Sequence, residues 1–482
     1  MDMNSQRVSE DWLSVWIGLG VFVLALAVLA GTDALGWVVS TSVWTDASKA
    51  LAPVSKNYAG IGGVGALLAT YVVLLVVMTG GAVALGAEVK RFAFAFSAVY
   101  WISYLCWIAG SYANLAVTNP GDLRKFGIDW SLRLTNEGGY IVALIAGLIV
   151  GNFLPGFAAM LKEAVRPEWY IKTAIVILGG FLGITAADKL SLATSLMFRG
   201  LAAIVEAYLI YWAVVYYVAR RWFGFSREWA APLASGISIC GVSAAIATGS
   251  AIRARPIIPI MVSSLVVVFS VVELLVLPFL AQAYLAHEPM VAGAWMGLAV
   301  KTDGAAVASG GITEALILAN AAAQGVEYQK GWILGTTTTV KVFIDVFIGI
   351  WAFILAWIWT TRIEVREGDR ARVGEIWERF PKFIIGYVIT FAVILIVALG
   401  ASPELTVRLK LAMGEANTLR VIFFVMTFFT IGVASNFRKL WDEGIGRLAA
   451  VYLLCLFGFV IWVGLVISFV FFGGVKPPLV AG

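Results

Sequence analysis

The sequence predicts an all-α polytopic membrane protein with about eleven transmembrane helices and two further segments that are broken or re-entrant. Composition is the first observation behind this class, because 61% of the 482 residues are hydrophobic and 13% are charged. Soluble domains carry about 45–50% apolar and about 25% charged residues. The second observation is that apolar runs of about 20 residues, long enough to cross a bilayer as a helix, recur along the chain. The third is that glycines and polar side chains interrupt two other apolar stretches.

The eleven predicted spans account for most of the chain. They occupy residues 12–30, 61–84, 92–115, 139–155, 171–186, 198–218, 257–285, 331–360, 383–400, 420–435 and 448–472. The first span follows an eleven-residue polar head and has no small-residue cleavage site, so we predict a retained anchor and not a signal peptide. Lys and Arg residues of a membrane protein mainly set its orientation. The net charge of +5 therefore indicates the lipid bilayer as a partner and no nucleic acid.

Several kinds of chemistry find no support in the sequence. The three cysteines, Cys106, Cys240 and Cys455, lie far apart within predicted spans, which argues against a disulfide framework or a zinc cluster. The single histidine, His287, argues against histidine-based metal sites, and there is no phosphate-binding loop for ATP. We therefore expect no enzymatic activity, no metal and no cofactor, apart from a coupling proton or sodium ion.

The two interrupted stretches are residues 229–250 and 292–322. The first reads WAAPLASGISICGVSAAIATGS, and the second contains GLAVKTDGAAVASGG at 297–311. Non-helical backbone at membrane depth persists only in a protein interior or a water-filled cavity, and the N-termini of half-helices attract anions. Transporters with inverted repeats place their sites at such paired breaks. We therefore predict that the two stretches meet at one site. The alternatives are helix-packing glycines for 229–250 and a surface Lys–Asp loop for 297–311.

Each stretch supplies candidate ligands for this site. In the first, Gly236 and Gly241 permit the break. In the second, Lys301 would attract an anion, while Asp303 would keep that lysine charged or carry the coupling ion. The predicted substrate-binding residues are Ser238, Cys240, Gly241, Ser243, Lys301, Thr302 and Gly304.

Four other charged residues lie at membrane depth. Lys341 and Asp345 are four residues apart on one helix, so they either pair with each other or face a transport cavity beside Thr336 to Thr339. Glu273 is either a gating or proton-linked carboxylate or a group neutralised by burial, and for Glu206 we expect burial alone. The candidates for coupling are Asp303, Glu273, Lys341 and Asp345.

The distribution of Lys and Arg predicts the orientation of the chain. If both interrupted stretches dip into the membrane and return, seven segments face inside: the N-terminal head, 85–91, 156–172, 219–228, 251–256, 361–382 and 436–447. They hold 20 of the 34 Lys and Arg residues, as the positive-inside rule requires. We therefore predict a cytoplasmic N-terminus and two re-entrant segments that enter from opposite faces.

Five motifs resemble one transporter family. They are GLIVGNFLPG (147–156), AIVILGGFLGI (174–184), SGISICGVSAAIATGSAIRA (235–254), TTTTVKVFIDV (336–346) and TIGVASNFRKL (430–440). Together they resemble the sulfate exporter family, within the superfamily of cation–proton antiporters and anion transporters. The resemblance covers about residues 139–472 and is most specific at 238–244. It implies a secondary carrier of the bacterial inner membrane, with inverted repeats, a scaffold and a mobile core.

Two features depart from that family. Many members carry Asn-Asp-Thr-Ser where this chain reads Lys301-Thr302-Asp303-Gly304, so a cation is added and the carboxylate moves by one place. A three-helix extension, residues 1–138, precedes the transporter core of 139–472 and the tail of 473–482. The extension would form a homodimer surface or an accessory scaffold.

These observations predict a secondary transporter, an exporter or exchanger, for a small inorganic or organic anion such as sulfate, a sulfonate or a carboxylate. The alternative is a cation–proton antiporter on the same fold, with Asp303 as the carrier carboxylate and Lys301 as its competitor. A channel or membrane sensor is the third class, and it would not need two charged breaks.

Overall fold

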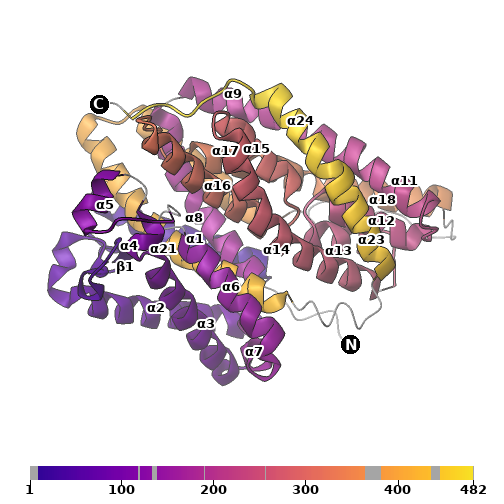
Figure 1. The fold of residues 1–482 in the computed structure, drawn as a ribbon. Coiled ribbons are helices and arrows are strands. Elements are labelled where there is room, and N and C mark those ends of the chain that lie inside the picture. Colours follow the sequence, from indigo (N-terminus) through magenta and orange to yellow (C-terminus); the bar gives the residue numbers. More distant parts are fainter. Residues whose placement is uncertain are drawn as a thin grey trace.

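The computed structural model describes residues 9–117, 120–132, 138–188, 190–255, 257–363, 381–435 and 446–480. Within these ranges, ten helices are long and apolar enough to cross a membrane, or eleven if the bent pair α6–α7 forms one span. The prediction of an all-α multi-pass membrane protein is therefore confirmed (Figure 1). A short antiparallel pair of strands, β1 (Val39–Thr41) and β2 (Leu51–Pro53), lies between the first two long helices.

The helices form two bundles. The first contains α1 (Glu10–Leu26), α2 (Gly62–Ala84), α3 (Val89–Gly110), α4 (Ala113–Ala116), α5 (Pro120–Phe126), α6 (Gly138–Phe153), α7 (Pro155–Leu161), α8 (Pro167–Asp188), α20 (Phe383–Leu399) and α21 (Pro403–Ala434). The second contains α9 (Leu190–Gly200), α10 (Ala202–Val205), α11 (Trp212–Arg221), α12 (Arg227–Ser238), α13 (Val242–Ala251), α14 (Ile257–Leu285), α15 (Pro289–Ala299), α16 (Asp303–Ala323), α17 (Trp332–Val346), α18 (Ile348–Ile358), α23 (Gly446–Cys455) and α24 (Ile461–Phe472). Three π-helical stretches, Glu206–Tyr211, Trp359–Ile363 and Leu456–Val460, lie within long helices of the second bundle.

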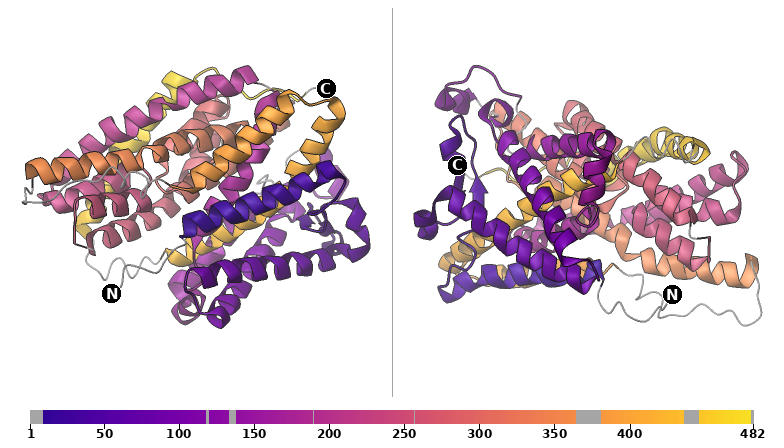
Figure 2. Two further views of the ribbon diagram at one scale, coloured as in Figure 1. Left: turned by 180° about the vertical axis from the view of Figure 1, so that it is seen from behind. Right: turned by 90° about the horizontal axis from the view of Figure 1, so that it is seen from below.

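Small residues hold the first bundle together. A Cβ atom on Gly147 of α6 would lie 2.1 Å from the carbonyl oxygen of Phe429 on α21, and one on Gly179 of α8 would lie 2.2 Å from Thr390 Oγ1 on α20. Glycines let membrane helices approach this closely. The predicted extension is part of this bundle, because α1 packs on α8 and α3 packs on α6. Figure 2 shows these N-terminal helices gathered on one side of the molecule.

Each predicted span coincides with a helix, but two boundaries were wrong. The span predicted at 420–435 is the second half of α21, which runs for 32 residues from Pro403. Its first half carries Glu404, Arg408, Lys410 and Glu415, so its hydropathy did not mark it as a span. The span predicted at 198–218 lies within a continuous helical segment that begins at Leu190 and ends at Arg221.

The stretch predicted at 229–250 folds as a helical hairpin. Helices α12 and α13 are separated by a break at Ile239–Gly241. Thr248 Oγ1 donates to Ser235 Oγ at 2.6 Å, and the backbone N–H of Arg255 donates to Glu228 Oε1 at 2.8 Å. The start of α12 and the end of α13 therefore lie together, so the segment returns to the side from which it entered. Partial burial acts to raise the pKa of Glu228 at this base, but its hydrogen bonds from Arg255 outweigh burial and lower it.

The second interrupted stretch, 292–322, forms another helical hairpin. Helices α15 and α16 are separated by a break at Val300–Thr302. Both pack on Thr337 of α17, whose Oγ1 donates to the carbonyl of Gly293 at 2.7 Å and would lie 2.5 Å from a Cβ atom on Gly310. Because Gly293 precedes the break and Gly310 follows it, the two helices run side by side.

Helix α14 sets the relative direction of the two hairpins. It has 29 residues, which corresponds to about 43 Å of α-helix and exceeds the about 30 Å of a bilayer core. Its first residue follows the base of the α12–α13 hairpin, and its last residue precedes the base of the α15–α16 hairpin. The two hairpins therefore open at opposite ends of α14 and point toward each other, as the sequence predicted.

Candidate functional site

The tips of the two hairpins meet inside the second bundle. A Cβ atom on Gly241 would lie 3.2 Å from the carbonyl oxygen of Lys301 and 3.2 Å from Thr302 Cγ2. Gly241 has a φ angle of +69°, a left-handed conformation that glycine adopts without strain. The prediction that the two stretches meet in space is confirmed. Ser243 follows the first tip in α13, but its side chain lies outside the described part of the chain.

Lys341 connects the two tips. Its ammonium group, on α17, donates to the carbonyl of Ile239 at 2.9 Å and to the carbonyl of Lys301 at 3.2 Å. The same nitrogen lies 3.7 Å from Asp303 Oδ1, and both side chains are almost fully buried. Of the two alternatives stated for Lys341, the structure does not favour pairing with Asp345, because the ammonium group points from α17 into the gap between the tips and meets Asp303 there.

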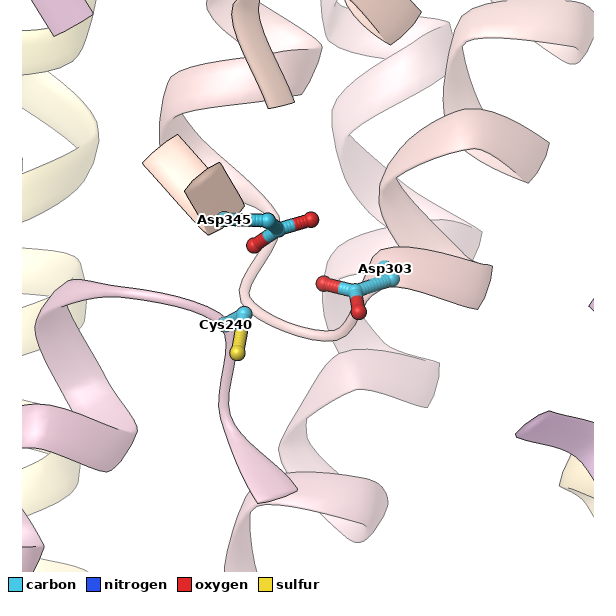
Figure 3. Close-up of side chains that lie close together, drawn as sticks. All are labelled: Cys240, Asp303 and Asp345. Atoms are coloured by element: carbon cyan, nitrogen blue, oxygen red, sulfur yellow. The ribbon is translucent and has the colours of Figure 1, made fainter. Parts of the chain in front are cut away.

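Asp345 instead faces Asp303 and Cys240. Figure 3 shows the two carboxyl groups and the thiol converging from α17, α16 and the α12–α13 tip. One ligand atom from each of the three lies within 4.8 Å of the others. Two carboxyl groups this close repel each other when both are ionised. Among the described residues this trio could hold a metal ion, but the Lys341 ammonium already supplies a positive charge beside it.

Lys301 has different partners from those expected. Its ammonium group donates to the carbonyl of Leu298, at the end of α15, and lies 4.8 Å from the ring centre of Tyr211. Asp303 was predicted to be its partner, and this was wrong because Asp303 faces Lys341. The backbone N–H of Lys301 donates to Glu273 Oε2 at 2.9 Å. Glu273 therefore binds the tip backbone directly.

Two tyrosines complete the surroundings of Lys301. The hydroxyl of Tyr211 contacts the carboxylate of Glu206, and the hydroxyl of Tyr452 lies 3.4 Å from Glu273 Oε1. Glu206 and Tyr211 begin and end a π-helical stretch, whose i to i+5 spacing explains why they face each other. Burial alone was expected for Glu206, which is indeed buried and also contacts Tyr211. The sequence carried no signal for either tyrosine, because contacts between distant helices place them here.

The remaining predicted residues have mixed roles. Ser238 is buried at the end of α12, and its Oγ has no hydrogen-bond partner among the described residues. Thr302 caps α16 by accepting a hydrogen bond from the N–H of Ala305 at 3.2 Å. A Cβ atom on Gly304 would make ordinary contacts of 3.5 Å or more with Ile171, so close packing does not require glycine there. The sequence analysis overlooked Glu314, which accepts hydrogen bonds from three backbone N–H groups at the start of α17.

The fold and this site define a multi-pass helical membrane protein with two helical hairpins whose tips meet at buried charges. The chain belongs to the UPF0324 membrane protein family. The family described as "Conserved hypothetical protein 698" matches residues 131–450. A UPF0324 membrane protein of Nitrosomonas europaea is 38% identical over 98% of this chain and 97% of its own. A second, from Rhodopirellula baltica, is 32% identical over 65% of this chain and 54% of its own.

One further relative matches a shorter part. An uncharacterized protein of Archaeoglobus fulgidus is 50% identical over 30% of this chain and 89% of its own. No solved structure matches the chain significantly.

Proposed function

We propose that this protein is a secondary transporter of a small anion, with sulfate or an organic sulfonate or carboxylate as substrate and with no chemical step. One observation carries the proposal: two re-entrant hairpins from opposite ends of α14 meet at the buried cations Lys301 and Lys341. Intramembrane charges are costly and mark solute pathways. Paired breaks in transporters are the usual place for a binding site.

The helix termini at the tips favour an anion. Helices α13 and α16 both begin there, and helix N-termini carry a partial positive charge and free N–H groups. Lys341 is placed to share its ammonium group between Asp303 and an entering anion. Because Lys341 and not Lys301 meets Asp303 at the tips, we assign the main role in charge recognition to Lys341.

The Asp303–Asp345 pair is the proposed coupling group. Its carboxyl groups lie close together beside Lys341, so an anion that drew the Lys341 ammonium group away would favour protonation of one of them. A proton would then move with, or against, the anion. The resemblance to the sulfate exporter family supports export or exchange across a bacterial inner membrane, and the Lys and Arg distribution supports a cytoplasmic N-terminus.

A cation–proton antiporter is the second candidate function. The observation that favours it is the buried cluster of Cys240, Asp303 and Asp345, whose ligand atoms lie within 4.8 Å of one another. In that case a cation would take the place of the Lys341 ammonium group beside Asp303, Lys341 would lose a proton to water and become neutral, and that proton would be the exchanged ion.

Flux measurements in proteoliposomes separate the two functions. Purified protein is reconstituted, and uptake of sulfate, methanesulfonate, acetate and sodium is measured with and without a pH gradient. The anion transporter requires uptake of at least one anion and its loss in Lys341→Gln. The antiporter requires sodium–proton exchange that is lost in Asp303→Asn. Sodium exchange without any anion flux would overturn the anion proposal.

A further inference from the structure

A cleft separate from the hairpin tips lies between the two bundles. Its space is about 760 Å³ when the open solvent at its mouth is included. Residues of α3, α6, α8 and α21 face residues of α16, α17 and the connection before α17 across it. Its residues on α16, Gly311 and Glu314, come 8 and 11 positions after Asp303. At 1.5 Å per residue, the cleft is about 12–17 Å along α16 from the tip site.

Arg420 provides a positive charge in this cleft. It lies in the middle of α21 and is 9% exposed. Its Nε donates to Asn417 Oδ1 at 2.5 Å, and its guanidinium carbon lies 4.6 Å from the ring centre of Phe424. Among the described residues, no carboxylate lies within ion-pair distance of Arg420. A buried cation that has no counter-charge in the described part of a membrane protein is costly and indicates a function.

A second cation lies at the rim of the cleft. Lys330 is exposed and belongs to the polar connection 324–331 between α16 and α17. The cleft is therefore reached from water on the side where the α15–α16 hairpin opens. The carboxylate in the lining, Glu314, is bound to the backbone N–H groups that begin α17, so its negative charge is offset by that helix terminus.

The other walls are aromatic. Trp107, Tyr140, Phe181 and Phe424 line the cleft. Sites for organic molecules combine such apolar walls with a few placed polar groups, and the planar guanidinium of arginine binds carboxylates and similar acid groups through two N–H bonds. A small inorganic anion would leave the aromatic walls without a contact.

We propose that this cleft binds an amphipathic organic anion that arrives from water. Its acid group, a sulfonate or carboxylate, would bind Arg420 and Lys330, and its apolar body would pack against Trp107, Tyr140 and Phe424. This site is additional to the tip site and does not depend on the proposed transport function. The headgroup of an anionic lipid has the same chemistry, and the experiment distinguishes the two sources.

Equilibrium binding to the full-length protein tests the proposal. Benzenesulfonate and methanesulfonate are titrated into protein in a neutral detergent, and binding is followed by calorimetry. We expect benzenesulfonate to bind more tightly than methanesulfonate, and Arg420→Gln to weaken it about tenfold or more, as for loss of a hydrogen bond to a charged group. Lys330→Gln, at an exposed position where folding is not at risk, should weaken it several-fold. Arg408→Gln removes the same charge from an exposed position of α21 and should bind like the parent.

Three outcomes would overturn the proposal. They are unchanged binding in both Arg420→Gln and Lys330→Gln, equal affinity for the two sulfonates, or displacement of benzenesulfonate by phosphatidylglycerol at low lipid ratios. The last outcome would assign the cleft to a lipid. Because the readout is binding and not flux, a failure of anion transport in proteoliposomes would leave this result standing.

Discussion

Lys341 and Asp303 are buried partners, and removal of either one leaves the other as an uncompensated charge. We therefore expect Lys341→Met to destabilise the protein by about 3–5 kcal/mol, the usual cost of breaking a buried ion pair. Thermal unfolding in detergent measures the loss. The double variant Lys341→Met/Asp303→Asn should recover much of it, because both charges are then gone.

The matched control for this prediction uses Lys301. Its ammonium group binds a carbonyl and an aromatic ring and not Asp303, so Lys301→Met and Asp303→Asn should have additive effects. If the Lys301 variant couples to Asp303→Asn and the Lys341 variant does not, the observed pairing is wrong and the pairing expected from the sequence is correct.

The sequence predicted part of this site at the level of residues. Two charges two positions apart in an apolar run required a break in the helix, and the break lies at Val300–Thr302. Their partners could not be predicted, because Lys341 comes 40 residues later and Tyr211 comes 90 residues earlier. Only the packing of the π-helical stretch Glu206–Tyr211 and of α17 around the tips decides which carboxylate meets which lysine.

At the level of elements, the α12–α13 hairpin depends on its tip glycine. In Gly241→Ala the left-handed backbone costs about 1–2 kcal/mol, and the new methyl group would lie 2.5 Å from Val266 Cγ1, which adds an overpacking cost of about 1–3 kcal/mol. We expect a lower melting temperature and loss of flux. Gly414→Ala, in α21 with no atom within 4 Å of the new Cβ, should change neither, and equal effects of the two substitutions would contradict the tip geometry.

The closure of the same hairpin can be tested by cross-linking. Glu228 and Arg255 contact each other at its base, so a Glu228→Cys/Arg255→Cys chain should form an internal disulfide under mild oxidation, detected by mass spectrometry. The three native cysteines are buried, and the parent chain serves as the control. A segment that crossed the membrane would separate the two positions by about 30 Å and would give no disulfide.

The sequence predicted the long membrane-spanning helices better than it predicted the first half of α21 and the two hairpins. Composition alone located the spans, because the bilayer demands long apolar runs. It missed the first half of α21, whose charged side chains resemble those of a soluble helix, although the buried second half continues it without a break. The hairpin form of the two interrupted stretches depends on contacts such as Ser235–Thr248, which glycine spacing indicates only indirectly.

At the level of the whole molecule, the two hairpin bases should face opposite sides of the membrane. Single cysteines at Arg227, Arg255 and His287 should be labelled by an impermeant thiol reagent from two different sides, the first two from the cytoplasm and the third from outside. The 361–382 loop was also predicted to be cytoplasmic, but residues 364–380 lie outside the described part of the chain. Labelling of all three cysteines from one side would contradict the arrangement set by α14.

The 3.7 Å contact between Lys341 and Asp303 has a consequence for the electrical behaviour of the protein. A membrane potential does work only on net charge, about 2.3 kcal/mol per elementary charge for each 100 mV. The two opposite charges of this pair cancel, so voltage would not drive its movement across the membrane. The membrane potential would then act on the charge of the bound solute and on any proton held by Asp345. Transport of a monovalent anion together with that proton would move no net charge across the membrane. Transport of a divalent anion with one proton would move one net charge and would be measured as a current.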